Sequence, residues 1–184
     1  GQALNPRGEL YTAANIGGPI IQDKLWWFGT YRTQKNAIAQ PSFAFDKTFD
    51  TKLWNAVGKL TYQLTQNNKF IGYYQWGQKS QPNRLTDAGY TYATEGSTYL
   101  QDSGSWVYKG EWNGTISEKL YVEARYGDFG YYFPQITNGS DPYFFRDSGT
   151  LEITGSHQKN QNDRDRKQLT SAATSSRACS TAAS

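Results

Sequence analysis

The 184-residue sequence has one cysteine, one histidine, six prolines and no methionine. The single cysteine, Cys179, cannot form an intramolecular disulfide, which excludes a disulfide-stabilised scaffold. No apolar run approaches the roughly 20 residues that a membrane-spanning helix needs. The charges are mixed along the chain, with a formal net charge of +3 and no basic block, so nucleic acid is not expected as a partner. Because neither a signal peptide nor an initiator methionine is present, we expect a piece of a longer chain.

Common enzyme motifs are also missing. The sequence contains no HExxH, P-loop or GxSxG motif. His157 lies in a polar segment and is expected to be a solvated loop residue. Asp163 and Asp165 alternate with arginines, which favours a charged loop or strand entry over a metal site. We therefore predict no enzymatic activity, no catalytic residue, no metal and no cofactor.

Aromatic residues are plentiful, at 16% of the chain, although the mean hydropathy is only −0.79. Apolar and polar residues alternate over residues 53–64, 69–79, 105–116 and 119–126. This period of two is typical of β-strands with one apolar and one polar face. The segments are longer than the five or six residues of an ordinary strand. No segment has a clear helical period.

The run "GGPIIQDKLWWFGTY", residues 17–31, predicts a hairpin with strands at 11–18 and 25–34. Both faces of its second strand begin with aromatic residues near the turn, because Trp26 and Trp27 are neighbours. Aromatic belts of this kind occur where strands enter a membrane. The other short connections are "TQNN" and "SE", whereas residues 35–52, 80–102 and 133–148 form long ones. Short turns on one side and long loops on the other are typical of outer-membrane barrels.

The predicted fold is all-β: an antiparallel up-and-down transmembrane β-barrel. Six strands are expected, with a seventh near Thr150. This is fewer than the roughly eight strands of the smallest such barrels, so the barrel is predicted to be partial. We expect residues 1–168 to form this partial barrel and residues 169–184 to be a disordered or frame-shifted tail.

Three sets of residues are candidates for function. Charged residues on the polar face are expected to line the lumen, where they would contact a plug or substrate or form simple charge pairs: Arg32, Lys59, Lys109, Glu111, Glu123 and Arg125. Aromatic residues in the long loops are candidates either for substrate contact or for ordinary loop packing: Tyr90, Tyr92, Tyr143, Phe144 and Phe145. The predicted membrane-belt aromatics are Trp26, Trp27, Trp54, Tyr62, Trp76, Trp106 and Trp112.

The stretch "NIGGPIIQDKLWWFGTYRTQ" resembles the start of the barrel in TonB-dependent outer-membrane receptors of the Oar-like class, which carry a carboxypeptidase-regulatory-like domain. The segment "GKLTYQLTQNNKFIGYYQW" is similar to the family's second hairpin, and "QNDRDRKQ" to the approach to a later strand. The resemblance covers about residues 10–168. The plug and the energy-coupling box, which the family places upstream, are absent from this sequence, as are the later strands.

The resemblance implies a receptor in the bacterial outer membrane that takes up a bulky substrate with energy supplied through the TonB complex. Its implied partners are outer-membrane lipid, the plug and the rest of the barrel, the TonB complex, and an imported substrate whose identity stays open. Two alternatives remain: a soluble β-sandwich that binds carbohydrate through exposed Trp and Tyr, and a nonspecific porin.

Overall fold

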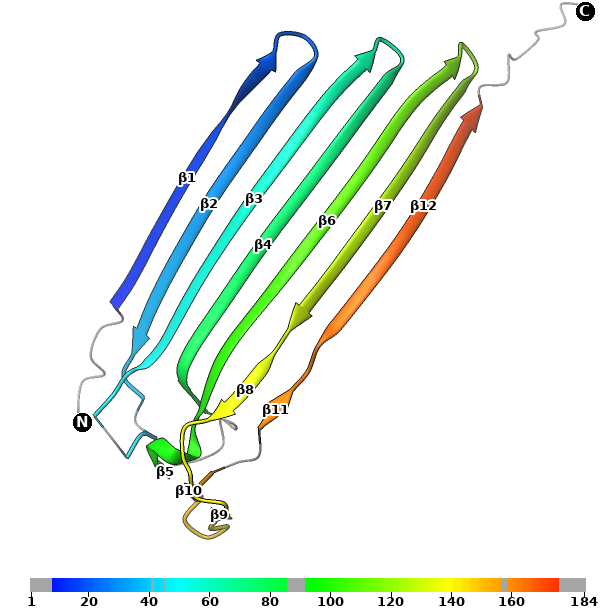
Figure 1. Cartoon of the computed structure of the whole chain (residues 1–184). Helices are drawn as coiled ribbons and strands as arrows, with labels where there is room; N and C mark the ends of the chain where they lie inside the picture. Colours follow the sequence, from blue (N-terminus) through cyan, green and yellow to red (C-terminus); the bar gives the residue numbers. More distant parts are fainter. Residues whose placement is uncertain (1–7, 41, 45, 86–91, 157–158, 176–184) are drawn as a thin grey trace, which may run out of the picture.

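The computed structural model describes residues 8–40, 42–44, 46–85, 92–156 and 159–175. Its main feature is one antiparallel sheet in which seven long strands lie side by side in chain order (Figure 1). Along the sheet these strands are β1 (Gly8–Ile21), β2 (Leu25–Ile38), β3 (Phe49–Thr65), β4 (Asn68–Arg84), β6 (Tyr99–Ser117), β7 (Leu120–Tyr132) and β12 (Arg164–Ser175). The all-β, antiparallel prediction is confirmed. The outer strands β1 and β12 lie at opposite edges, so the described residues form an open sheet.

Tight turns join β1 to β2, β3 to β4 and β6 to β7. All of these turns lie at one end of the sheet (Figure 1). In the β1–β2 turn, Lys24 N donates to Ile21 O at 3.1 Å, and Asp23 has a φ of 59°. Aspartate tolerates this left-handed conformation better than most residues. In the β3–β4 turn, Thr65 Oγ1 accepts hydrogen bonds from Asn67 N at 3.3 Å and Asn68 Nδ2 at 3.0 Å. Local polar contacts therefore fix these turns.

The longer connections gather at the other end of the sheet (Figure 1). Here β8 (Pro134–Thr137) pairs with β6 and with β11 (Asn160–Gln161). A separate three-stranded sheet contains β5 (Tyr92–Ala93), β10 (Glu152–Gly155) and β9 (Phe144–Arg146), and a 3₁₀ helix, η1, spans Glu95–Ser97. In the part of the chain that the structure describes, no helix has the length and apolar character needed to cross a membrane.

The strands extend beyond their predicted ends. Residues 69–79 were expected as a strand, but β4 continues to Arg84, and β6 begins at Tyr99, before the predicted residue 105. The alternation of apolar and polar residues fades there, but the backbone hydrogen bonds continue. The pairing between β4 and β6 becomes irregular only between Gln81 and Arg84, around Pro82. Proline lacks the N–H that a regular ladder needs.

The seventh strand is not where the sequence placed it. Thr150 lies in the turn between β9 and β10, and these short strands belong to the separate three-stranded sheet, so the region near Thr150 does not supply a seventh strand of the main sheet. The seventh long strand is β12, which pairs with β7 from Arg164 opposite Tyr131 to Ser175 opposite Leu120. The expected boundary between residues 168 and 169 therefore falls inside a strand. Residues 176–184 lie outside the described residues, and the frame-shift interpretation stays a prediction.

Very little of this structure is a hydrophobic core. Among the described residues, the buried hydrophobic side chains are Ala93, Tyr99 and Ile153. Ala93 and Ile153 pack with Leu85 and Phe144 at the long-loop end. The main sheet is a single layer whose large apolar side chains are exposed, as for Leu60 at 50% and Tyr108 at 46%. The apolar surface of the main sheet is therefore left uncovered by the described chain.

The stability of the turn between β9 and β10 is predicted to depend on pH. Asp147 Oδ1 accepts hydrogen bonds from the backbone N–H groups of Thr150, at 3.0 Å, and Gly149, at 2.7 Å. These bonds favour the carboxylate, so the pKa of Asp147 lies below its ordinary value. A lowered pKa stabilises the turn above the unfolded-state pKa, and this stabilisation is lost as the pH falls through the folded-state pKa.

As the pH falls through the folded-state pKa of Asp147, we expect the amide chemical shifts of Gly149 and Thr150 to move toward the values of an unfolded chain. Asp147→Asn is the matched control, because it keeps a side-chain oxygen acceptor that does not titrate. An unchanged acid transition in Asp147→Asn would contradict the assigned role of this carboxylate.

Candidate functional site

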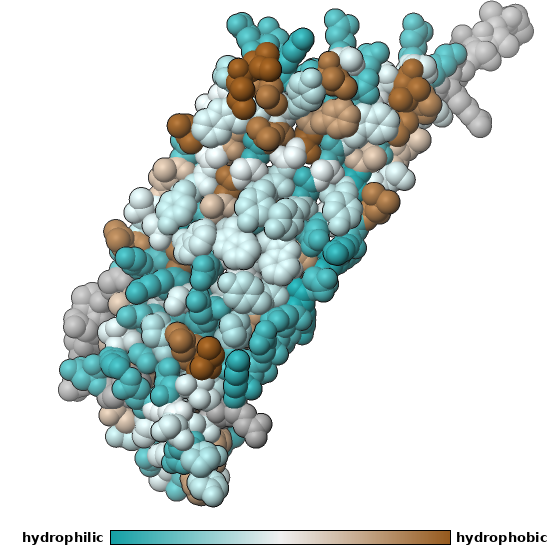
Figure 2. All heavy atoms as spheres, viewed as in Figure 1, coloured by the Kyte–Doolittle hydropathy of each residue, from teal (hydrophilic) through white to brown (hydrophobic). Residues whose placement is uncertain are grey.

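The strand register assigns the residues of the sheet to two faces, because residues opposite one another in neighbouring strands point to the same side. One row runs Tyr31, Ala56, Trp76, Trp106 and Gly130 across β2, β3, β4, β6 and β7. We call the side of this row the aromatic face. It carries no charged residue at the alternate positions of 54–64, 70–76 or 106–116. Figure 2 shows hydrophobic atoms gathered toward the hairpin end, pale rings across the middle and hydrophilic atoms at the far end.

Most of the predicted belt aromatics share the aromatic face. Pairing places Trp27 opposite Leu60, Thr33 opposite Trp54, and Phe70 opposite both Tyr62 and Trp112. Trp26 differs, because it lies opposite Thr61 and therefore points to the other face. The strand alternation thus separates Trp26 from the other belt residues.

Aromatic rings on this face contact one another and cover glycines. The rings of Trp76 and Trp106 are stacked, with centroids 6.4 Å apart and planes at 16°, and the Tyr74 and Tyr108 centroids are 5.0 Å apart. A Cβ at Gly130 would lie 2.2 Å from the Trp106 ring. The missing side chain therefore lets the ring lie against the backbone.

Charges appear on the aromatic face toward the β12 edge. Asp128 lies opposite Lys167 in the register and accepts a hydrogen bond from Trp106 Nε1 at 3.4 Å. Asp128 also lies opposite Tyr108, so these charged groups stand level with the middle of β6. On β3 and β6 the uncharged positions continue past this level toward the long-loop end, as far as Trp54 and Trp106.

The six predicted lumen residues all share the opposite face, which we call the polar face. The register pairs Lys59 with Tyr73, Tyr73 with Lys109, and Glu111 with Arg125. Asn113 lies opposite Glu123, and Asn55 opposite Arg32. The structure thus brings these charged residues to one side of the sheet, and their place in a lumen stays a prediction.

Ion pairs and ring contacts connect some of these residues. Arg125 lies 3.0 Å from Glu123 and 3.6 Å from Glu111. Lys109 Nζ is 5.5 Å from the centroid of the Tyr73 ring. Half-exposed pairs of this kind contribute at most about 1 kcal/mol each to the free energy of unfolding. These contacts therefore make this face polar but add little to stability.

The aromatic residues of the long loops are divided between two environments. Phe144 packs against the Ala93 and Ile153 core, which is the loop-packing alternative. Tyr143 and Phe145 are 68% and 66% exposed, and Tyr92 is 45% exposed. These three lie in or beside the small sheet at the long-loop end, and Tyr90 falls outside the described residues.

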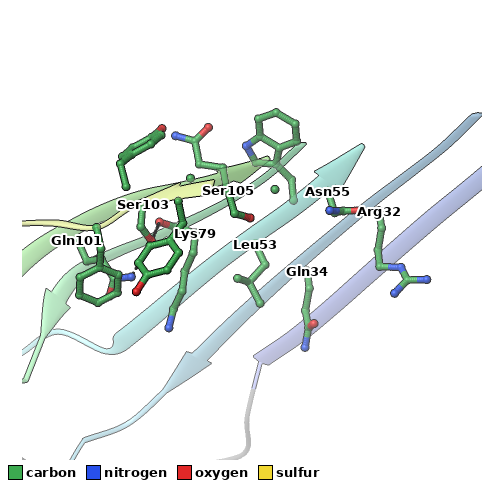
Figure 3. A pocket seen from close by; sticks show the side chains of 15 residues that line it. Arg32, Gln34, Leu53, Asn55, Lys79, Gln101, Ser103 and Ser105 are labelled. Atoms are coloured by element: carbon green, nitrogen blue, oxygen red, sulfur yellow. Dashed lines mark hydrogen bonds between the residues drawn. The ribbon is translucent and has the colours of Figure 1, made fainter. Parts of the chain in front are cut away.

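A cleft of about 440 Å³ lies on the polar face near the long-loop end (Figure 3). Two neighbouring rows of the register form it. One row runs Arg32, Asn55, Gly77, Ser105 and Tyr131, and the other runs Gln34, Leu53, Lys79 and Ser103. Glycine and serine leave a hollow between larger neighbours. In Figure 3 the side chains of Arg32, Gln34, Leu53 and Lys79 project to the same side of the strands.

Hydrogen bonds fix the floor of this cleft. Gln101 is fully buried, donates through Nε2 to Ser103 Oγ at 2.7 Å and accepts a hydrogen bond from Arg84. The Arg84 guanidinium lies 5.0 Å from the Phe133 ring centroid. Asn55 Nδ2 donates to Trp76 O at 3.1 Å. The polar lining is therefore held in place by the strands and by side-chain contacts.

Of the residues predicted from the sequence, Arg32 and the predicted belt residue Trp54 line this cleft. The sequence interpretation missed its polar members: Gln34, Asn55, Lys79, Gln101, Ser103, Ser105 and Tyr131. Their position on the polar face could have been read from strand alternation in part. The alignment of Gly77 with Ser105 could not, because it depends on how β4 and β6 pair.

No metal site emerges from the described ranges, where no three His, Cys, Asp or Glu side chains form a group that could hold an ion. His157 and Cys179 lie outside those ranges. Asp163 fixes the strand entry instead: its Oδ1 accepts a hydrogen bond from Phe133 N at 3.2 Å and its Oδ2 from Gln161 Nε2 at 2.7 Å.

Comparison of the chain with protein-family models, curated proteins and solved structures gives no match.

Proposed function

We propose that the chain forms part of the wall of a bacterial outer-membrane β-barrel, in a TonB-dependent receptor that imports a bulky substrate. One observation carries the membrane part: a single-layer sheet of long antiparallel strands has an aromatic, mostly uncharged face and a charged face, with no large element covering either among the described residues. A lipid-facing wall needs this division between its two sides.

The dimensions of the aromatic face support the same proposal. A strand rises about 3.3 Å per residue, so about 10 residues tilted by about 45° span roughly the 25 Å of a barrel's apolar band. On β3 the uncharged alternate positions run from Trp54 to Leu64, and on β6 from Trp106 to Ile116. These stretches match the length that the bilayer requires.

The polar face and the loops support the receptor part. Lys59, Lys109, Glu111 and Arg125 would face a wet lumen that holds a plug. Dependence on TonB is supported by the resemblance around residues 15–34. The soluble sandwich is less well supported, because the long strands lie in one sheet and no second large sheet packs on it within the described residues.

Site-directed fluorescence tests the membrane part. Cysteines are introduced singly at neighbouring positions of β3, Leu60→Cys and Thr61→Cys, in a Cys179→Ser background, and labelled with bimane after reconstitution in lipid vesicles. Because successive side chains point to opposite faces, we expect nitroxide-labelled lipid to quench the label at position 60 several-fold more than the label at 61. Aqueous iodide should show the opposite preference.

Equal quenching at the two positions, or a chain that stays folded and monomeric in plain buffer, would overturn the membrane proposal. The receptor part has its own test, which is to sequence the DNA upstream of residue 1. A plug and an energy-coupling box in the same reading frame are expected. A continuous barrel gene without either would favour the porin.

A further inference from the structure

We infer that the cleft on the polar face binds a small anion that also carries hydroxyl groups, of the chemical class of sugar acids. This inference deepens the proposed function, because the cleft lies on the face that would line the lumen. It rests on the residues of two register rows, which are built into five strands of the sheet.

The charge of the cleft favours an anion. Arg32 and Lys79 are part of its lining, and none of the described lining residues is an aspartate or glutamate. Two carboxylates lie at the margins: Glu9 Oε1 accepts a hydrogen bond from Gln34 Nε2 at 2.9 Å, and Asp163 accepts one from Phe133 N. A third, Asp102, accepts a hydrogen bond from the lining residue Gln78 at 2.8 Å, on the aromatic face of the sheet. Lys79 lies between Leu53 and Ser103 in its row, away from both margins. We therefore place the ligand's anionic group at Lys79.

The neighbours of Lys79 favour hydroxyl groups on the same ligand. Asn55, Ser103 and Ser105 come from β3 and β6 and lie on both sides of Gly77 and Lys79 of β4. Adjacent strands are about 4.8 Å apart, so these donors and acceptors are spread over a distance comparable to the hydroxyls of a sugar ring. Tyr131 adds a ring and a hydroxyl at one end.

The size and rigidity of the cleft fit a small ligand. Its volume of about 440 Å³ lies within the range of small-molecule sites. The floor is close-packed, because a Cβ at Gly77 would lie 3.2 Å from Ser105 Oγ and 3.3 Å from Asn55 Nδ2. Buried Gln101 holds Ser103 through its Nε2. The polar groups are thus held in position before any ligand arrives, which lowers the cost of binding.

Isothermal titration of the full chain with D-glucuronate and with D-glucose tests this inference. Saturable binding of glucuronate is expected, at least about tenfold tighter than that of glucose, because only glucuronate has a carboxylate that can form a hydrogen-bonded ion pair with Lys79. Lys79→Gln should weaken glucuronate binding about tenfold or more, and Lys79→Arg should restore most of it. Lys69→Gln is the matched control: Lys69 lies on the same strand and face, at the hairpin end, and its loss should change the dissociation constant less than twofold.

Equal affinity for glucose and glucuronate would overturn the assignment, and so would unchanged affinity in Lys79→Gln or the absence of saturable binding. Where Lys79→Gln fails to fold, Gly77→Val serves instead, because it fills the floor and should abolish binding of glucuronate. Titration is carried out in whichever medium keeps the chain monodisperse, detergent or buffer. The titration therefore tests binding in the cleft independently of whether the chain lies in a membrane.

Discussion

Leu60→Lys is expected to destabilise the chain in a membrane by about 2 to 4 kcal/mol, the cost of lysine on the lipid face of a barrel at mid-depth. Leu60 lies on the aromatic face of β3, four residues before the end of the predicted 53–64 alternation, and is 50% exposed in the isolated sheet. The free energy of unfolding in lipid vesicles, measured by urea titration with tryptophan fluorescence, would report this loss.

The neighbouring substitution Thr61→Lys provides the control. Thr61 points to the polar face, opposite Trp26 and Ile71, so a lysine there can reach water. We expect its effect to stay below about 1 kcal/mol, as for most surface substitutions. If Leu60→Lys were as mild as Thr61→Lys, the aromatic face would not face lipid. In a soluble protein an exposed Leu60 would tolerate lysine equally well.

Gly130→Val is the second substitution with a large expected effect, a loss of about 1 to 3 kcal/mol in the free energy of unfolding, typical of overpacking. A Cβ at this position would lie 2.2 Å from the Trp106 ring. The ring would have to leave its stack on Trp76 and its hydrogen bond to Asp128. The same urea titration measures the loss, and near-ultraviolet circular dichroism reports the change around tryptophan.

Gly58→Ala separates this clash from the general effect of removing a glycine. Gly58 lies on the same face, but a Cβ there meets nothing within 4 Å. We expect this substitution to be neutral or to stabilise by about 0.5 to 1 kcal/mol, because alanine restricts the unfolded chain more than glycine does. Equal losses in both variants would refute the steric role of Trp106.

Local patterns in the sequence were sufficient to predict the strands and their faces. The alternation through Lys59 and Leu60 is a property of one strand, and it assigns each side chain to a face without knowledge of the neighbours. Short connections such as "SE" then require antiparallel hairpins. For this reason the shared face of Lys59, Lys109 and Arg125 follows from single-strand patterns joined by tight turns.

The cleft and the last strand depend on information that no single segment carries. Gly77 lies beside Ser105 only because of the register between β4 and β6, which a long connection separates in the chain. Residues 169–175 lack the alternation of the other strands, yet they pair with β7. An open strand edge supplies backbone hydrogen bonds to almost any extended segment, so side-chain patterns do not identify such a strand.

The route by which β12 reaches β7 also bears on the order of assembly. The β1–β2, β3–β4 and β6–β7 hairpins close over a few residues, so little chain entropy is lost before their first contacts form. β12 arrives only after the excursion through residues 133–163. We therefore expect the edge of β7 to pair with β12 only after these hairpins have closed. Until β12 pairs there, we expect that a strand from another chain can compete for this edge, and that crowding at the site of synthesis favours mispaired polymers over the native sheet.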